Sequence, residues 1–120
     1  MDAPKQSDLK RVVGAIQKSG LAMVEANLKA SQLADDEKNY LAALMNSLAS
    51  GEKRSEAQLE REARGSKEFR EYVRGRCIAQ AEAGRLKVRY QALQSLFEAK
   101  RSELALEREK ISKGIFHSGG

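Results

Sequence analysis

Residues 9–48 read LKRVVGAIQKSGLAMVEANLKASQLADDEKNYLAALMNSL, and this stretch decides the fold. Its apolar and small side chains recur at alternating steps of three and four residues, which place them on one face of an α-helix. This first stripe comprises Leu9, Val13, Ile16, Gly20, Met23, Asn27, Ala30, Ala34, Glu37, Leu41, Leu44 and Leu48. A second stripe comprises Tyr72, Arg76, Ala79, Ala83, Leu86, Tyr90, Leu93, Phe97, Lys100 and Leu104. Two such helices predict an all-α, coiled-coil-like hairpin whose long helices run antiparallel.

Capping residues predict where the helices begin and end. Ser7 is suited to cap a first helix that continues to about residue 49. The run Asp35-Asp36-Glu37 could instead start a separate helix, so a break near Ala34 is an alternative. We favour one continuous helix, because the heptad phase survives this run.

Signals after the first helix predict a short connecting helix. Ser50-Gly51 ends the first helix, and Ser55 with Gln58 three residues later forms a capping box for a helix over 56–63. Ser66 then caps the second long helix, from Lys67 to about Ser112.

The predicted organisation is a disordered N-terminus over 1–6, a helical hairpin domain over 7–113 and a flexible tail over 114–120. In the tail, Ile115-Phe116 form an apolar hook that either docks on a partner or neighbouring subunit or is simply disordered.

A register follows if Leu48 is joined to Phe69 across the turn. Gly20 then faces Phe97, and Ala34 faces Ala83 at a thin waist. Glu37 and Arg76 fall within one turn of each other in an otherwise apolar seam. We expect these two to form an ion pair, because an unpaired charge there would be costly.

The core of a two-helix hairpin is thin for its length, so we expect a homo-oligomer. Further apolar positions would then be covered by another subunit, or alternatively by one extra short helix of the same chain. These positions are Leu21, Val24, Leu28, Leu96 and Leu106.

The amino-acid composition narrows the class of protein and the compartment in which it works. The 120 residues are 41% hydrophobic and 32% charged, with no Trp, which is typical of long-helix proteins. Cys77 is the only cysteine, which excludes an internal disulfide and favours a reducing compartment. We interpret it as a small residue at the edge of the seam rather than a reactive thiol activated by Arg74 and Arg76. The absence of a signal peptide or membrane-length apolar run predicts a cytoplasmic protein.

No cluster of metal-ligating residues, no phosphate-binding loop and no nucleophile–base pair is found in the sequence. His117 stands alone, and the segment 51–55 lacks the strand that a phosphate loop requires. We therefore expect no cofactor, no metal and no enzymatic activity.

The net charge of +5 is concentrated in one segment. Residues 53–89 hold eleven basic and six acidic side chains, whereas the flanking segments nearly balance. Arginine-rich surfaces suit phosphate, so we predict non-specific binding of single-stranded nucleic acid. The predicted contact residues are Lys53, Arg54, Arg61, Arg64, Lys67, Arg70, Arg74, Arg85 and Arg89. The alternative is a solvated helix face balanced by Glu68, Glu71 and Glu82.

Aromatic side chains for base stacking are scarce. Tyr72 and Tyr90 fall on the seam and are expected in the core. Tyr40 lies off the stripe and is the better stacking candidate, although a core position is favoured for it too.

The layout resembles a known family. A long helix ending in Ser50-Gly51, the tripeptide Arg54-Ser55-Glu56 opening a short helix, and a long last helix are similar to the UvsY-type phage recombination mediators. The layout is also similar to small helical proteins encoded beside phage single-strand annealing proteins. The resemblance covers residues 10–105. It implies a cytoplasmic helical oligomer of bacteriophage type that binds single-stranded DNA and helps load a recombinase onto strands coated by single-strand-binding protein.

The sequence thus favours a non-enzymatic DNA recombination accessory protein that binds single-stranded DNA. Its expected partners are further copies of itself and a recombinase, annealing protein or single-strand-binding protein. The alternative is a helical protein-interaction module, a coiled-coil adaptor or an inhibitor of a host protein, that binds no nucleic acid.

Overall fold

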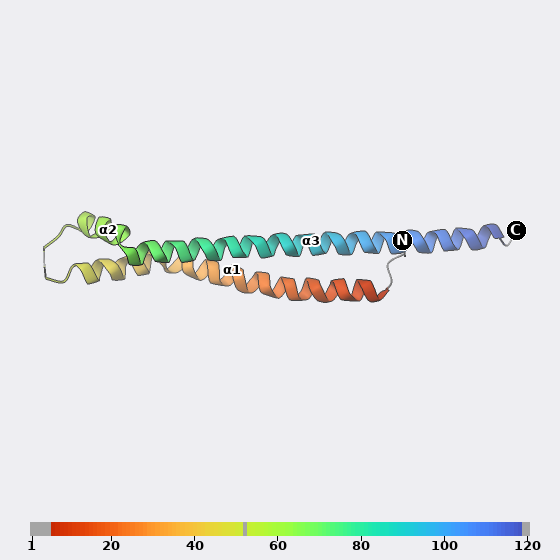
Figure 1. Ribbon diagram of the computed structural model, residues 1–120, viewed down its shortest axis with the longest axis horizontal. Coiled ribbons are helices and arrows are strands. Elements are labelled where there is room, and N and C mark those ends of the chain that lie inside the picture. Colours follow the sequence, from red (N-terminus) through yellow and green to blue (C-terminus); the bar gives the residue numbers. More distant parts are fainter. Residues whose placement is uncertain (1–5, 52, 119–120) are drawn as a thin grey trace. The chain divides into compact units, whose positions relative to one another are not determined.

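The computed structural model describes the backbone of residues 6–51 and 53–118, and the side chains of these residues up to Lys113. Helix α1 spans Gln6–Leu48, helix α2 spans Glu56–Gly65 and helix α3 spans Lys67–Ser118. The described residues contain no strand, so the predicted all-α class, with two long helices joined by a short one, is confirmed (Figure 1). Across these same residues, none of the helices combines the length and apolar character that a membrane crossing needs.

Helix α1 is continuous, so the alternative of a break near Ala34 is wrong. It starts at Gln6, which places Ser7 inside the first turn rather than at the N-cap. Apart from Gln6, the predicted disordered segment 1–6 lies outside the described residues. The predicted stop at Ser50-Gly51 is confirmed. Gly51 has a φ of +100°, a left-handed conformation that glycine adopts without a steric penalty.

Both predicted caps around α2 are present. The Gln58 backbone N–H donates to Ser55 Oγ at 3.2 Å, and the Ser55 N–H donates to Gln58 Oε1 at 3.3 Å, which completes the capping box. Ser66 receives a bond from the Phe69 N–H at 3.2 Å and donates from Oγ to the Ala63 carbonyl at 2.6 Å. One serine therefore ends α2 and begins α3.

Helix α3 runs six residues past its predicted end near Ser112, so most of the predicted tail over 114–120 is helical backbone. No proline follows, and the i,i+4 ion pair of Glu109 with Lys113, at 3.0 Å, supports this turn. Gly114 alone does not stop the helix. The side chains of the predicted Ile115-Phe116 hook lie outside the described residues.

The chain divides into two compact units. One unit joins the start of α1, up to Met23, to α3 from Leu86 onward. The other is Val24–Arg85, which contains the rest of α1, all of α2 and the start of α3. In both units a segment of α1 packs against an antiparallel segment of α3, as predicted.

The turn end of the unit Val24–Arg85 is held by a three-helix cluster. Leu41 of α1, Ala63 of α2 and Phe69 of α3 are buried together, and Ala63 is fully inaccessible to solvent. Leu44, Leu48 and Val73 pack against them among other apolar side chains. Helix α2 thus lies over the last turns of α1 and the first turns of α3 (Figure 1).

This cluster overturns the predicted register. Phe69 is buried together with Leu41, one heptad before the Leu48 that was predicted to face it, and Leu48 packs only at the edge of this cluster, which also holds Ala63 of α2. In the other unit the ring of Tyr90, not that of Phe97, lies against Gly20. The partner of Gly20 is displaced by seven residues from the prediction, from Phe97 to Tyr90, whereas the partner of Ala83 is displaced by four, from Ala34 to Ala30. A shift of seven residues keeps both stripes facing each other, so the stripes alone do not exclude it.

The waist of the unit Val24–Arg85 is built from alanine. Ala30, Ala79 and Ala83 form its buried cluster, against which Ala26 and Leu33 pack. Ala34, which was predicted to face Ala83, is exposed. The predicted thin waist is therefore present, with Ala30 in place of Ala34.

The predicted ion pair in the seam is confirmed. Arg76 Nε donates to Glu37 Oε1 at 2.6 Å, and the two side chains are only 25% and 31% exposed. Arg76 Nη1 also donates to Gln80 Oε1 at 3.2 Å. Partial exclusion of water strengthens such a charge-assisted bond.

Replacing Gly75 by Ala should stabilise the protein. Gly75 lies inside α3, and a Cβ there would meet no atom within 4 Å. The change should raise the free energy of unfolding by about 0.5–1 kcal/mol, since alanine loses less backbone entropy in a helix. Gly20→Ala is the contrasting variant. Its Cβ would lie 3.2 Å from Tyr90 Cε2, so the gain should be smaller or absent. Thermal and urea unfolding followed by circular dichroism measure both.

The Glu37–Arg76 pair should show a coupling energy of about 1–2 kcal/mol in a double-mutant cycle with Glu37→Gln and Arg76→Gln, because the pair is half-buried. The matched control is Glu82–Arg85, whose side chains are 52% and 67% exposed at a 2.8 Å separation. That pair should couple by only a few tenths of a kcal/mol. Equal coupling in the two cycles would contradict a special role for the seam pair.

Candidate nucleic-acid interface

Eight of the nine predicted contact residues lie in one compact unit. Lys53 and Arg54 precede α2, Arg61 and Arg64 lie on it, and the others lie along α3 up to Arg85. All are exposed except Arg54, which is half-buried. The ninth residue, Arg89, belongs to the other unit. The structure therefore gathers a basic tip around α2, which we define as Lys53, Arg54, Arg61, Arg64, Lys67 and Arg70.

Carboxylates neutralise part of this basic surface. Arg54 pairs with Glu62, and Arg64 Nη2 lies 3.0 Å from Glu60 Oε1. Along α3, Lys67 Nζ lies 3.9 Å from Glu71 Oε1, and Arg85 pairs with Glu82. The alternative of a helix face balanced by Glu68, Glu71 and Glu82 is thus realised in part, through Glu71 and Glu82, while Glu60 and Glu62 pair with two further cations. Exposed pairs of this kind contribute little free energy, so a phosphate can compete with the carboxylates for the cations.

Four of the eight predicted residues in the unit Val24–Arg85 have no carboxylate partner among the described residues. They are Lys53, Arg61, Arg70 and Arg74, and all four are exposed. Each keeps its full hydrogen-bonding capacity for an external anion.

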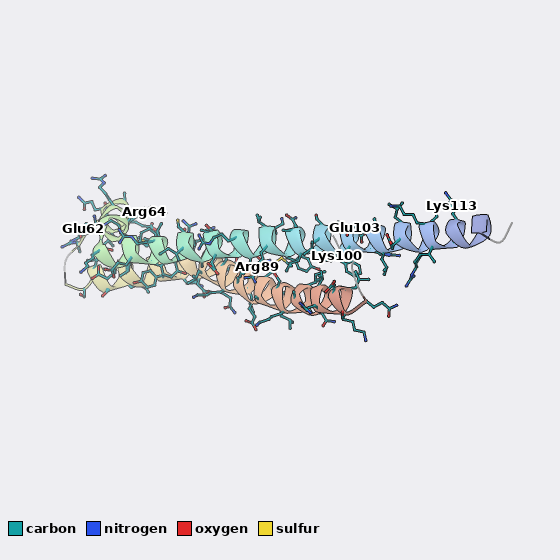
Figure 2. All side chains as sticks on the ribbon, turned by 45° about the vertical axis from the view of Figure 1, so that its right-hand side comes forward. Glu62, Arg64, Arg89, Lys100, Glu103 and Lys113 are labelled. Carbon is teal, nitrogen blue, oxygen red and sulfur yellow. The ribbon has the colours of Figure 1, made fainter. Side chains whose placement is uncertain are left out.

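Arg64 is positioned by an aromatic ring. Its guanidinium carbon lies 5.8 Å from the centroid of Phe69, which itself belongs to the buried three-helix cluster. This cation–π contact and the pair with Glu60 hold the Arg64 side chain at the corner between α2 and α3 (Figure 2). The corner is thereby a preorganised part of the basic tip.

Arg89 lies on a groove of its own unit. Lys18, Ser19 and Ala22 of α1 line this groove together with Leu86 and Arg89 of α3. Lys18 was missed in the sequence analysis because α1 is balanced in charge overall. The buried Ser19 Oγ has no hydrogen-bond partner among the described residues.

Tyr40 is not free for base stacking. Its ring stacks on that of Tyr72, with centroids 4.5 Å apart and planes 16° from parallel. The Tyr72 hydroxyl donates to the Leu33 carbonyl of α1 at 2.5 Å. Tyr40, Tyr72 and Tyr90 are all half-buried, as the preferred core interpretation predicted. Any binding at this surface must therefore depend on phosphate contacts rather than on these rings.

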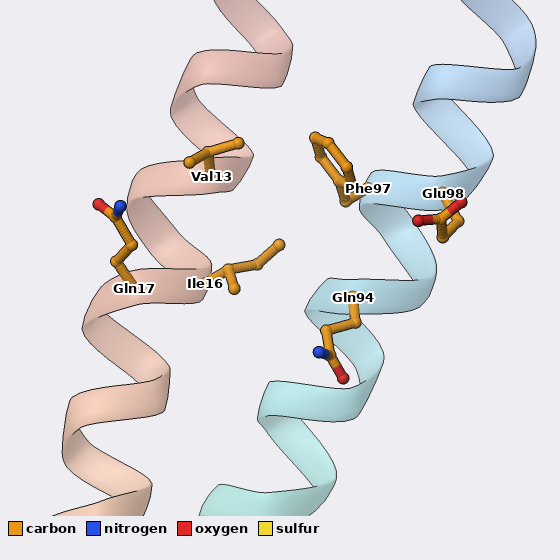
Figure 3. A pocket seen from close by; sticks show the side chains of 6 residues that line it. All are labelled: Val13, Ile16, Gln17, Gln94, Phe97 and Glu98. Atoms are coloured by element: carbon orange, nitrogen blue, oxygen red, sulfur yellow. The ribbon is translucent and has the colours of Figure 1, made fainter.

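A second groove in the unit that contains Met23 and Leu86 is apolar. Val13 and Ile16 of α1 point across it toward Phe97 of α3, while Gln94 lies lower in the gap (Figure 3). Its volume is about 310 Å³. Gln17 and Glu98 are its other lining residues, so Glu98 is the one charged group present and the lining holds no acid–base pair.

Cys77 is exposed and directly follows the half-buried seam residue Arg76. The described residues hold no group of three side chains suited to a metal ion.

Burial of the Tyr72 hydroxyl raises its pKa above the ordinary value of 10.0, and the carboxylates of Asp36 and Glu37 add to the shift against a lowering effect of Arg76. The folded state thus favours the neutral phenol. This stabilisation is present below pH 10 and is lost as the pH rises above 10, where the unfolded chain ionises first.

Tyr72→Phe should cost about 1 kcal/mol at pH 7, because it removes the bond to the Leu33 carbonyl. It should also flatten the loss of stability between pH 9 and 11 relative to the wild-type chain, on the ordinary tyrosine pKa of about 10. Urea unfolding across that pH range measures both effects. The informative quantity is the difference in stability between the two proteins at each pH, because they differ only at residue 72.

Comparisons with known proteins give this surface no precedent. No protein-family model, curated protein or solved structure matches the chain. The resemblance to the UvsY-type mediators therefore stays a prediction. The charged residues of the basic tip are therefore the basis for assigning a function.

Proposed function

We propose that this chain is a non-enzymatic nucleic-acid-binding protein that holds single-stranded DNA on the basic tip around α2. The observation that carries the proposal is the set of exposed cations without carboxylate partners among the described residues, gathered beside a positioned Arg64. Following the resemblance, the bound strand would be handed to a recombinase or annealing protein in the cytoplasm.

The chemistry of the tip supports backbone contacts. Arginine binds phosphate oxygens through its planar fork, and each phosphate contact releases counterions from the strand. A single strand is favoured because its flexible backbone can follow cations spread over α2, the preceding loop and α3. Since the tyrosine rings are engaged in the seam, the binding should be independent of base sequence.

The alternative of a protein-interaction module is favoured by one observation. Several large apolar side chains are more than half exposed, among them Leu21, Val88 and Leu106. Patches of this kind mark protein contacts. In that case an acidic protein surface would take the place of DNA at the basic tip, and capture of a partner would survive nuclease treatment.

Fluorescence anisotropy with a labelled oligonucleotide tests the proposal. The variant Lys53→Gln/Arg61→Gln/Arg70→Gln should bind several-fold more weakly than wild type. It should also reduce the slope of log K against log salt by about 2, since each phosphate contact on a single strand contributes about 0.7.

The matched control is Arg101→Gln/Arg108→Gln/Lys110→Gln, which removes the same charge from exposed positions elsewhere on α3. It should leave the slope nearly unchanged if binding is local to the tip. Equal losses in the two triple variants would show a general charge effect, and no binding at low salt would dispose of the proposal.

A further inference from the structure

The waist of the unit Val24–Arg85 has its large apolar residues on the outside. Its interior holds the small side chains of Ala30, Ala79 and Ala83. Val24 and Leu28 of α1 are each 59% exposed, and Ile78 of α3 is 60% exposed. The apolar bulk of this section is therefore available to a partner rather than to its own core.

Helical geometry directs these side chains away from the seam. Leu28 precedes the buried Ala30 by two residues, which is about 200° around the helix, so it points away from α3. Ile78 is next to the buried Ala79, and Arg74 and Arg85 lie within about 40° of it on the wheel. We call the two surfaces the outer α1 face (Val24, Glu25, Leu28 and Asp35) and the outer α3 face (Arg74, Ile78 and Arg85).

The two faces carry opposite charge. Glu25 and Asp35 are exposed and have no ion-pair partner among the described residues, and the same holds for Arg74. Arg85 contacts only Glu82 there, in a pair that is largely solvated and weak. Glu82 also lies within about 40° of Ile78, so over 74–85 the outer α3 face has two arginines against one glutamate, whereas the outer α1 face has two carboxylates.

The spacing of the two faces also matches. Glu25 and Asp35 are ten residues apart, or about 15 Å along the helix, and Arg74 and Arg85 are eleven apart, or about 16.5 Å. Leu28 follows Glu25 by three residues, and Ile78 follows Arg74 by four. When the helices are aligned in parallel, one apolar contact falls between two opposite-charge contacts.

We propose that the outer α1 face binds the outer α3 face of a second copy of this chain. Leu28 packs against Ile78 of that copy, Glu25 lies near Arg74 and Asp35 near Arg85. Because the two faces of the contact differ, each copy keeps one face open for a third, and the assembly grows into a row in which neighbouring copies point in opposite directions. Pairing two outer α3 faces would instead crowd Arg74 and Arg85 of both copies, which disfavours it.

Sedimentation velocity of the full chain without nucleic acid, over a concentration series, tests this contact. Wild type should associate, while Leu28→Glu and Ile78→Glu should each raise the apparent dissociation constant at least about tenfold, because each puts a charge into the apolar contact. The matched control, Leu106→Glu, alters an equally exposed residue of α3 outside this unit and should associate as wild type does. Circular dichroism checks that all variants fold.

Mixing experiments decide which faces meet. Leu28→Glu retains an intact outer α3 face and Ile78→Glu an intact outer α1 face, so an equimolar mixture should recover a dimer that neither forms alone. Asp35→Arg should weaken association, and Asp35→Arg/Arg85→Glu in one chain should restore it. A monomeric wild type, variants that associate normally, or a mixture that stays monomeric would each overturn the proposal. All of these results are independent of whether the basic tip binds DNA.

Discussion

The packing of Ala63 with Leu41 and Phe69 is the constraint on which the helix register depends. A fully buried methyl group leaves no room for a larger side chain, so α2 must lie close to both long helices. Helix α3 then starts beside Leu41 and leaves the last heptad of α1 to α2. The same cluster places Phe69 under the Arg64 guanidinium, at one corner of the basic tip.

Local signals in the sequence were sufficient for the three helices and for the caps on both sides of α2, but not for the start of α1, where Ser7 lies inside the first turn. Ser55 with Gln58, and Ser66 before Lys67, each have one favourable use at a helix start, and both are realised. The seam pair of Glu37 with Arg76 was also predictable, because two opposite charges in an apolar stripe must meet or be solvated. The end of α3 was not, because a glycine near a helix terminus allows the helix to stop without requiring it.

The register and the detail of the site depend on contacts that are distant in sequence. A slip of one heptad keeps both stripes facing each other, so the stripes alone do not decide whether Tyr90 or Phe97 faces Gly20. Charge counting located the basic segment correctly. It did not reveal which cations carboxylates occupy, that Arg89 belongs to another unit with Lys18, or that Tyr40 is covered by Tyr72.

The two proposals divide the basic segment between two partners without conflict. Arg74 and Arg85 point away from the seam at the waist, where a carboxylate-bearing helix of a second copy can reach them. Lys53, Arg61 and Arg70 belong to the basic tip, on or next to α2, and are not needed for that contact.

If assembly neutralises the waist, the charge that remains for nucleic acid is concentrated at the tip and is repeated once per copy. Several weak sites then act on one strand, and the effective concentration of each bound tip raises the affinity of the next. On these two proposals a modest net charge per chain is compatible with firm binding, because an assembly would multiply the phosphate contacts that a single chain makes.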